Sequence, residues 1–241
     1  MSEPSPGPKR AAFFDVDGTL VRTTIVHYYA YFRLLNRPRW SAALWRAAFL
    51  CRCLGYLVLD KFDRSWFNVY FYRNYRGMCA DEVRARAADC FETVMAPRLY
   101  ADAARCVRDQ AASGRMVVLV TGSIDFLIAP LAALLGVGQV IAPRLVERDG
   151  RFTGDLDGLP IGNGEKAARV KAFADAHGVD LEASFAYGDS IADLPMLECV
   201  GNPVAVNPDR ALRAIAARRG WPVLRWTAVG DARGDARGDA P

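Results

Sequence analysis

The sequence is poor in histidine, with only His27 and His177 among its 241 residues. Its six cysteines are Cys51, Cys53, Cys79, Cys90, Cys106 and Cys199. They are scattered through apolar helical patterns, and no pair has the CxxC spacing of a zinc site. We therefore expect neither a zinc centre nor a disulfide framework, but buried free thiols in a protein of the reducing cytoplasm.

The two ends of the chain lack apolar runs. Residues 1–10 are rich in proline, so we expect a disordered N-terminal tail and not a signal peptide. Residues 227–241 repeat Gly-Asp-Ala-Arg, a composition that cannot form a core, and a second disordered tail is predicted there. Over the whole chain, 52% hydrophobic residues and a net charge of only +4 are typical of a globular protein with a substantial core.

Acidic side chains are scarce in residues 21–76, where ten basic residues are accompanied only by Asp60 and Asp63. The same part of the chain is dense in aromatic residues, and its periodicity is helical. We interpret residues 21–95 as a helical insert. In the interpretation that we favour, its aromatic residues form a core of their own and its arginines face solvent.

Two other interpretations of this basic, aromatic insert are open. Residues 40–59 are nearly all apolar, but Arg46 and Arg52 would each cost about 2.5–3.5 kcal/mol in a bilayer, so we do not expect a membrane span. A peripheral contact with an anionic membrane would suit basic and aromatic side chains. Nucleic-acid binding is not expected, because no recognition motif is present.

Outside the insert, strand and helix patterns alternate along the chain. Apolar runs that predict buried strands end near Phe14 or lie at residues 116–120, 183–187 and 204–206. A hairpin turn is predicted at Arg148-Asp149-Gly150. The alternation predicts an α/β fold with a doubly wound parallel sheet, formed by residues 11–20 and 96–226.

The stretch Phe13-Phe14-Asp15-Val16-Asp17-Gly18-Thr19-Leu20 combines a buried strand with two carboxylates at its end. In an open α/β sheet, ligands bind at the carboxyl ends of the strands. Two carboxylates this close repel each other unless a cation or a shared proton intervenes. Oxygen ligands of this kind suit Mg²⁺. If the chain already turns at Asp17, that residue would present its backbone carbonyl and keep its side chain for proton transfer.

Further polar groups lie at other predicted strand ends and helix starts. They are Thr121-Gly122-Ser123, Lys166, and the pair Asp189 and Asp193. Each group alone is an ordinary turn, surface or capping feature. Their joint occurrence in this order favours a site for phosphoryl transfer. Asp189 would complete the Mg²⁺ site, and Asp193, four residues later, would support it from the same helical face.

The residue types predict definite roles in such a site. Asp15 is the candidate nucleophile and would form an aspartyl-phosphate. Asp17 would protonate the leaving oxygen and then accept a proton from the attacking water. Thr121 and the backbone of Gly122–Ser123 would hold phosphoryl oxygens, and Lys166 would add positive charge against them.

The motifs resemble those of the haloacid dehalogenase superfamily, and more narrowly its phosphoserine-phosphatase-like branch, subclass IB. The resemblance is carried by Phe14–Leu20, which contains the DxDGT signature, by Gly164-Glu165-Lys166, and by Tyr187–Leu197. It implies a Rossmann-like core in which residues 21–95 are a C1 cap, a helical lid that selects the substrate. It also implies an obligatory Mg²⁺ bound by the carboxylates of Asp15 and Asp189 and by the backbone carbonyl of Asp17.

One departure from the family pattern concerns the substrate. Phosphoserine phosphatases have a glutamate shortly after the first motif, and the corresponding position here is about Thr24, next to Thr23. A hydroxyl cannot replace a carboxylate that faces an ammonium group, so the cap predicts a more anionic or more apolar small-molecule phosphomonoester. We expect a Mg²⁺-dependent phosphatase. The alternatives are phosphoserine phosphatase proper, a phosphotransferase with the same intermediate, a membrane-associated lipid-phosphate phosphatase, or a membrane-binding protein with a vestigial site.

Overall fold

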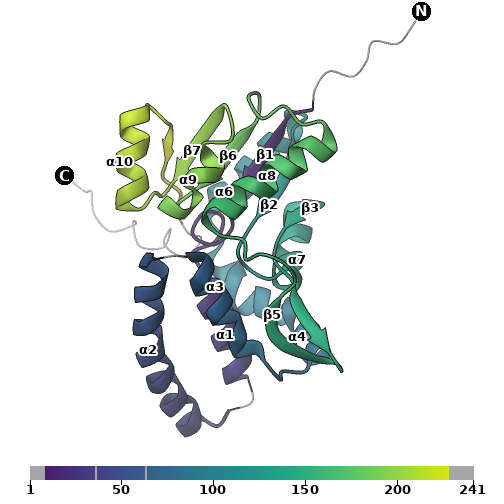
Figure 1. Ribbon diagram of the computed structural model, residues 1–241, viewed down its shortest axis with the longest axis vertical. Helices are drawn as coiled ribbons and strands as arrows, with labels where there is room; N and C mark the ends of the chain where they lie inside the picture. Colours follow the sequence, from purple (N-terminus) through teal and green to yellow (C-terminus); the bar gives the residue numbers. More distant parts are fainter. Residues whose placement is uncertain (1–8, 36, 63, 228–241) are drawn as a thin grey trace, which may run out of the picture.

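The computed structural model describes residues 9–35, 37–62 and 64–227. Their main sheet has six strands in the order β3-β2-β1-β6-β7-β8. These strands are β1 (Ala11–Phe14), β2 (Met116–Val120), β3 (Gln139–Ile141), β6 (Phe185–Gly188), β7 (Asn202–Val206) and β8 (Val223–Leu224). All neighbouring pairs are parallel. The predicted doubly wound α/β fold is therefore confirmed (Figure 1).

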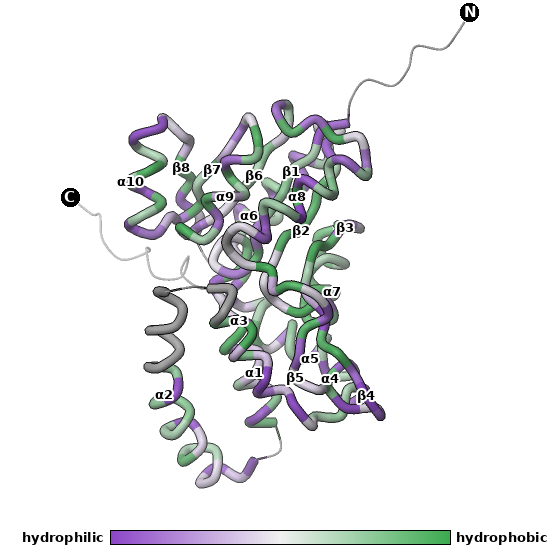
Figure 2. Tube along the Cα trace, in the orientation of Figure 1, coloured by the Kyte–Doolittle hydropathy of each residue, from purple (hydrophilic) through white to green (hydrophobic). Residues whose placement is uncertain are grey.

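Helices cover both faces of the sheet. They are α6 (Ala101–Ala112), α7 (Asp125–Leu135), α8 (Asn163–His177), α9 (Leu194–Leu197) and α10 (Arg210–Arg219). Phe14 and Leu119 pack with α6 and α7, whereas Phe13 and Val118 pack with α8, α9 and α10. Successive side chains of a strand point to opposite faces, so a strand covered on both sides is apolar along its length. β1 and β2 are accordingly hydrophobic (Figure 2).

The expected helical insert lies at the carboxyl ends of the central strands (Figure 1). Its elements are α1 (Ile25–Leu34), α2 (Arg39–Phe62), α3 (Arg64–Tyr72), the 3₁₀ turn η1 (Arg73–Tyr75), α4 (Ala80–Ala85), α5 (Ala87–Cys90) and the π-helical η2 (Phe91–Met95). The 3₁₀ turn η3 (Ala96–Arg98) then leads into α6. Helix α2 forms the outer edge of the insert in this view.

The aromatic residues of the insert do not form a core of their own, which corrects the expectation from the sequence. Tyr29, Phe49 and Phe71 belong to the same buried cluster as Phe14 of β1. The physical reason is that the insert folds back onto the end of the sheet, so its apolar side meets the core. In contrast, Trp40 on α2 is 75% exposed.

The predicted hairpin is confirmed as β4 (Leu145–Arg148) and β5 (Arg151–Leu156), which pair in antiparallel orientation. Its two turn residues, Asp149 and Gly150, both have positive φ angles, of 51° and 69°. Such angles match the right-handed twist of a two-residue hairpin. The hairpin lies beside η1 and α3 of the insert, where Gly77 N–H donates to the Phe152 carbonyl at 2.8 Å.

Several smaller expectations can be compared with the structure. All six cysteines are free, as expected, but only Cys90 is buried, and Cys51 is exposed. Residues 1–8 and 228–241 of the two predicted tails lie outside the described residues, while Lys9 N–H donates to the Gly178 carbonyl at 3.1 Å. None of the helices in the described part of the chain combines the length and apolarity that a transmembrane segment needs.

Candidate active site

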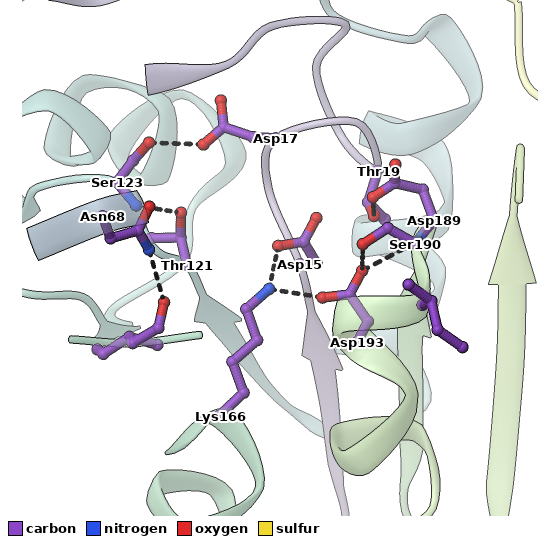
Figure 3. Close-up of polar contacts among 12 residues, drawn as sticks. Asp15, Asp17, Thr19, Asn68, Thr121, Ser123, Lys166, Asp189, Ser190 and Asp193 are labelled. Carbon is purple, nitrogen blue, oxygen red and sulfur yellow. Dashed lines mark hydrogen bonds and ion pairs between the residues drawn. The ribbon is translucent and has the colours of Figure 1, made fainter. Parts of the chain in front are cut away.

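The polar groups named from the sequence meet at one end of the sheet because their strands are neighbours. Asp15 directly follows β1, Thr121 follows β2 and Asp189 follows β6, and β1 lies between the other two strands. Lys166 lies in the first turn of α8, on the same edge. Figure 3 shows these side chains converging from separate loops. Parallel strands end at a common edge, which places loops distant in sequence side by side.

Asp15 and Lys166 form a buried ion pair at the centre of the site. Lys166 Nζ donates to Asp15 Oδ1 at 2.5 Å and to Asp193 Oδ1 at 2.6 Å. The exposed fractions of the three residues are only 4% for Asp15, 6% for Lys166 and 1% for Asp193. The other carboxylate oxygen of Asp15, Oδ2, is buried and has no hydrogen-bond partner among the described residues. A buried charged oxygen without a partner is costly, and such atoms mark functional sites.

Burial and charge shift the ionisation of this pair in opposite ways. Burial, and then the Asp193 carboxylate, raise the pKa of Asp15 to about 6, although Lys166 opposes the shift. Burial alone would lower the pKa of Lys166, but Asp15 and Asp193 outweigh it and raise that pKa. Lys166 is therefore a permanent cation at neutral pH, and Asp15 is a carboxylate that gains from a further positive neighbour.

Asp193 organises the loop after β6. Its Oδ2 accepts hydrogen bonds from the Asp189 and Ser190 backbone N–H groups, at 3.3 and 3.1 Å, and from the Ser190 hydroxyl at 3.0 Å. These contacts cap the 3₁₀ turn η4 (Ile191–Asp193). The other oxygen of Asp193, Oδ1, accepts a hydrogen bond from Lys166. These contacts are compatible with the supporting role predicted for Asp193.

Asp189 lies against the loop that follows β1. Thr19 Oγ1 donates to Asp189 Oδ1 at 3.1 Å. Gly18 has a φ of +98°, and a Cβ at this position would stand 2.3 Å from Asp189 Oδ2. Glycine is therefore required in the motif for two reasons, the positive φ and the close approach of a carboxylate.

The arrangement fits a divalent cation. Asp15, Asp189 and Asp193 each offer a carboxylate oxygen, and these atoms lie within 4.8 Å of one another. One of these three residues, Asp15, has an oxygen, Oδ2, that lacks a hydrogen-bond partner among the described residues. The three carboxylates share one neighbouring ammonium group, which contacts Asp15 and Asp193, so a phosphate dianion would be repelled without an added cation. The cluster contains the two expected carboxylates, Asp15 and Asp189, and adds Asp193. The ligand expected from Asp17 is its backbone carbonyl, which is not one of these side-chain atoms.

The Asp17 carboxylate instead accepts three hydroxyl hydrogen bonds. Tyr28 Oη donates to Oδ1 at 2.6 Å, Thr23 Oγ1 to the same atom at 3.0 Å, and Ser123 Oγ to Oδ2 at 2.5 Å. Tyr28 belongs to α1 of the insert and is fully buried. Burial, and then Asp17, raise the pKa of Tyr28 well above its ordinary value, so the phenol stays a donor. The insert thus holds the candidate acid–base residue directly.

The Thr121-Gly122-Ser123 turn is tied to the insert as well. Tyr72 Oη donates to the Gly122 carbonyl at 2.6 Å. Ser123 N–H donates to Thr121 Oγ1 at 2.9 Å, so this amide, predicted to hold phosphate, is engaged within the turn. Asn68, buried on α3, donates from Nδ2 to the Ile161 carbonyl at 3.3 Å (Figure 3). Two side chains of α3 therefore dock on loops of the core.

A cavity of about 250 Å³ opens onto Asp15, Asp17 and Lys166. The insert contributes six residues to its lining, namely Thr24, Ile25, Val26, Cys53, Phe67 and Asn68. Pockets for drug-sized ligands measure roughly 300–1,000 Å³, so this site suits a smaller molecule. Sequence reasoning placed Thr24 near the substrate but missed Tyr28 and Asn68, since neither residue stands in a motif that would distinguish it from its helical neighbours.

The chain belongs to the family of haloacid dehalogenase-like hydrolases, whose profile matches residues 12–198. The inhibition of morphological differentiation protein of Streptomyces azureus is 36% identical over 224 residues, which cover 90% of this chain and 78% of that protein. A probable phosphatase of Mycobacterium tuberculosis is 34% identical over 233 residues, 92% of this chain and 77% of the relative. A solved structure of a protein with unknown function from Bordetella pertussis Tohama I superimposes with a TM-score of 0.78 at 30% identity, covering 90% of this chain and 98% of that one.

Proposed function

We propose that the protein is a Mg²⁺-dependent phosphomonoester hydrolase that acts through an aspartyl-phosphate on Asp15. The observation that carries this proposal is the buried Asp15 carboxylate, which contacts Lys166 through Oδ1 while Oδ2 has no hydrogen-bond partner in the described part of the chain. Such an oxygen is poised for an incoming cation or phosphorus atom. The similarity to a probable phosphatase of Mycobacterium tuberculosis supports the same class of reaction.

Asp15 and Asp189 would hold the Mg²⁺ through their carboxylates and Asp17 through its backbone carbonyl. When bound, the cation neutralises the carboxylate cluster and the charge on the transferring phosphoryl group. Asp193 already uses Oδ2 to cap η4 and Oδ1 to bind Lys166. We therefore propose Asp193 as a positioning residue and keep Asp15, Asp17 and Asp189 as the ligand set.

In the first step, a carboxylate oxygen of Asp15 attacks phosphorus, and the bond from phosphorus to the ester oxygen breaks. A protonated Asp17 gives its proton to that oxygen, so the alcohol leaves neutral. In the second step, water attacks the phosphorus of the aspartyl-phosphate and loses a proton to Asp17, which restores both aspartates and releases inorganic phosphate. Lys166 stabilises the equatorial oxygens throughout. The hydroxyls of Thr23, Tyr28 and Ser123 keep Asp17 oriented.

We further propose that residues 21–95 are the C1 cap of a subclass IB enzyme, with residues 11–20 and 96–226 as its catalytic core. The described cap residues around the cavity include Thr24 and no carboxylate. An ammonium group on the substrate would have no described partner there, which disfavours phosphoserine. The contacts from Asn68 and Tyr72 to core loops support a cap that covers the site.

The proposal is tested by phosphate release from p-nitrophenyl phosphate with Mg²⁺ or with EDTA, for the wild type and for Asp15→Asn. After an acid quench, mass spectrometry should find one phosphoryl group on the peptide that contains Asp15. Turnover without a labelled Asp15 peptide would contradict the covalent mechanism. Release of phosphate that Asp15→Asn does not abolish would contradict the role of Asp15. Added alcohols that replace water as acceptor would point to the phosphotransferase.

A further inference from the structure

We infer that the substrate is the phosphate ester of a small, uncharged and mainly apolar alcohol. This inference rests on the proposed function and adds the chemical class of the leaving group. All charged side chains in the described lining of the cavity, Asp15, Asp17 and Lys166, come from the core and are engaged with the phosphoryl group in the proposed reaction. The leaving group would therefore meet the neutral part of the described lining, which comes from the insert and from Gly122, Ile161, Gly162 and Ala192 of the core.

The described side chains of the insert that line the cavity are uncharged. Ile25, Val26 and Phe67 are apolar, and Cys53 is a thiol whose pKa is raised by burial. Thr24 is polar but neutral. A charged group on the alcohol would leave water without gaining an opposite charge from these side chains, and burying an unpaired charge costs several kcal/mol. Apolar groups, in contrast, gain about 25 cal/mol for each Å² that they bury.

Three described arginines of the insert are engaged with other groups of the protein and not with the cavity. Arg52 donates to Asn74 Oδ1 at 3.0 Å, Arg73 stacks over the Tyr70 ring, and Arg76 donates to the Thr153 carbonyl at 2.8 Å. None of these arginines lines the cavity. Of the two substrate classes that the sequence left open, the structure therefore favours the apolar one over the anionic one.

Asn68 marks the polar end of this surface. Its Nδ2 donates to the Ile161 carbonyl and would stand only 2.9 Å from a Cβ added to Gly122. The amide is thus fixed between two core loops, close to the Thr121-Gly122-Ser123 turn. Apolar side chains make up most of the remaining lining from the insert, and the cavity of about 250 Å³ limits the enclosed alcohol to a short one.

The experiment compares kcat/KM for butyl phosphate, phosphoethanolamine, phosphoserine and 3-phosphoglycerate, with p-nitrophenyl phosphate as the reference for chemistry. We expect butyl phosphate to exceed each charged ester at least about tenfold, which corresponds to 1.4 kcal/mol. Val26→Glu adds a carboxylate to the lining and should lower the ratio of butyl phosphate to phosphoethanolamine about tenfold. Leu44→Glu, at a position on α2 that is 69% exposed, is the matched control and should leave this ratio unchanged.

Two results would overturn the inference while the proposed function stands. One is rapid hydrolysis of p-nitrophenyl phosphate together with a preference for phosphoserine or 3-phosphoglycerate. The other is a Val26→Glu variant that hydrolyses p-nitrophenyl phosphate normally and keeps the wild-type ratio. If no phosphate is released from any ester in the presence of Mg²⁺, the proposed function itself fails.

Discussion

The core and the helical insert contribute different side chains to one cavity. All the charged residues of its described lining, Asp15, Asp17 and Lys166, come from the core, which also contributes Gly122, Ile161, Gly162 and Ala192. The insert contributes neutral residues such as Ile25 and Phe67. Under the proposed function, bond breaking would depend on the core and substrate selection largely on the insert, so substitutions in the two regions should have separable effects.

The two aspartates of the first motif sharpen this comparison, although they are only two residues apart. Asp15 is bound by an ammonium group of the core, whereas Asp17 is bound by hydroxyls that include Tyr28 from the insert. Of the three charged side chains in the described cavity lining, Asp17 is the one for which hydrogen bonds from the insert are described. Substitutions at these contacts can test whether bond breaking and substrate selection depend on different regions of the protein.

The largest effect is expected from removing the proposed nucleophile. Asp15→Asn keeps the size of the side chain but not its nucleophilic charge, so kcat should fall by about 10³-fold or more for every ester. A stopped assay for inorganic phosphate measures this fall. Loss of the nucleophile should lower kcat by the same factor for all substrates. A factor that differs between esters would contradict the division of roles between core and insert.

The second largest effect is expected from removal of Mg²⁺. EDTA should abolish turnover, and Asp189→Asn should raise the Mg²⁺ concentration for half-maximal activity at least about tenfold, because substitutions even in the surroundings of metal ligands cost 10–100-fold in affinity. Mg²⁺ should also raise the melting temperature of the wild type, as any ligand of the native state does. A variant with the same Mg²⁺-induced shift as the wild type would exclude Asp189 as a ligand.

Tyr28→Phe should lower kcat about tenfold, because a buried hydrogen bond to a charged group contributes about 1.5–3 kcal/mol. The loss should be larger for butyl phosphate than for p-nitrophenyl phosphate, whose leaving group needs less protonation. Tyr75→Phe is the matched control, since Tyr75 is equally buried and its hydroxyl lacks a hydrogen-bond partner in the described part of the chain. Equal losses in both variants would show that Tyr28 acts only through packing.

Asp15→Asn should also stabilise the metal-free protein, in a pH-dependent way. The pKa of Asp15 is raised from 3.8 to about 6 by burial and Asp193, so its contribution to stability is complete below pH 3.8 and is lost as the pH rises through 6. Asparagine avoids that loss. The melting temperature of the variant should therefore exceed that of the wild type by several degrees at pH 7.5 in EDTA, and by less at pH 4.5. An equal difference at both pH values would contradict the raised pKa.

Much of this architecture follows from local patterns in the sequence. Alternating faces make β2 a continuous apolar run, and the prediction for residues 116–120 agrees with the structure because a buried strand needs no tertiary information to be recognised. The convergence of Asp15 and Asp189 could be predicted as well, since parallel strands end at one edge of the sheet.

The contributions of the insert could not be predicted in the same way. Tyr28 and Asn68 act through the docking of α1 and α3 on the core, which depends on packing between distant segments. The sequence pattern does not show which distant segments pack together, so it predicts a separate aromatic core in the insert. In the structure, Phe71 packs in the same cluster as the sheet. The orientation of the Asp17 carboxylate is likewise set by Thr23 and Tyr28 and not by the strand that precedes it.

The smallest effect on catalysis is expected from the outer face of α2, which carries exposed Trp40 and Leu44 beside Arg39 and Arg46. None of these four residues is in the described lining of the cavity. Trp40→Glu combined with Leu44→Glu should therefore leave kcat/KM for p-nitrophenyl phosphate unchanged. The same double variant tests the peripheral membrane contact, which stays a prediction. If the wild type sediments with vesicles of anionic lipid at low salt and the variant does not, α2 binds membranes through a surface separate from catalysis. If neither sediments, the arginines of α2 serve only as a solvated face.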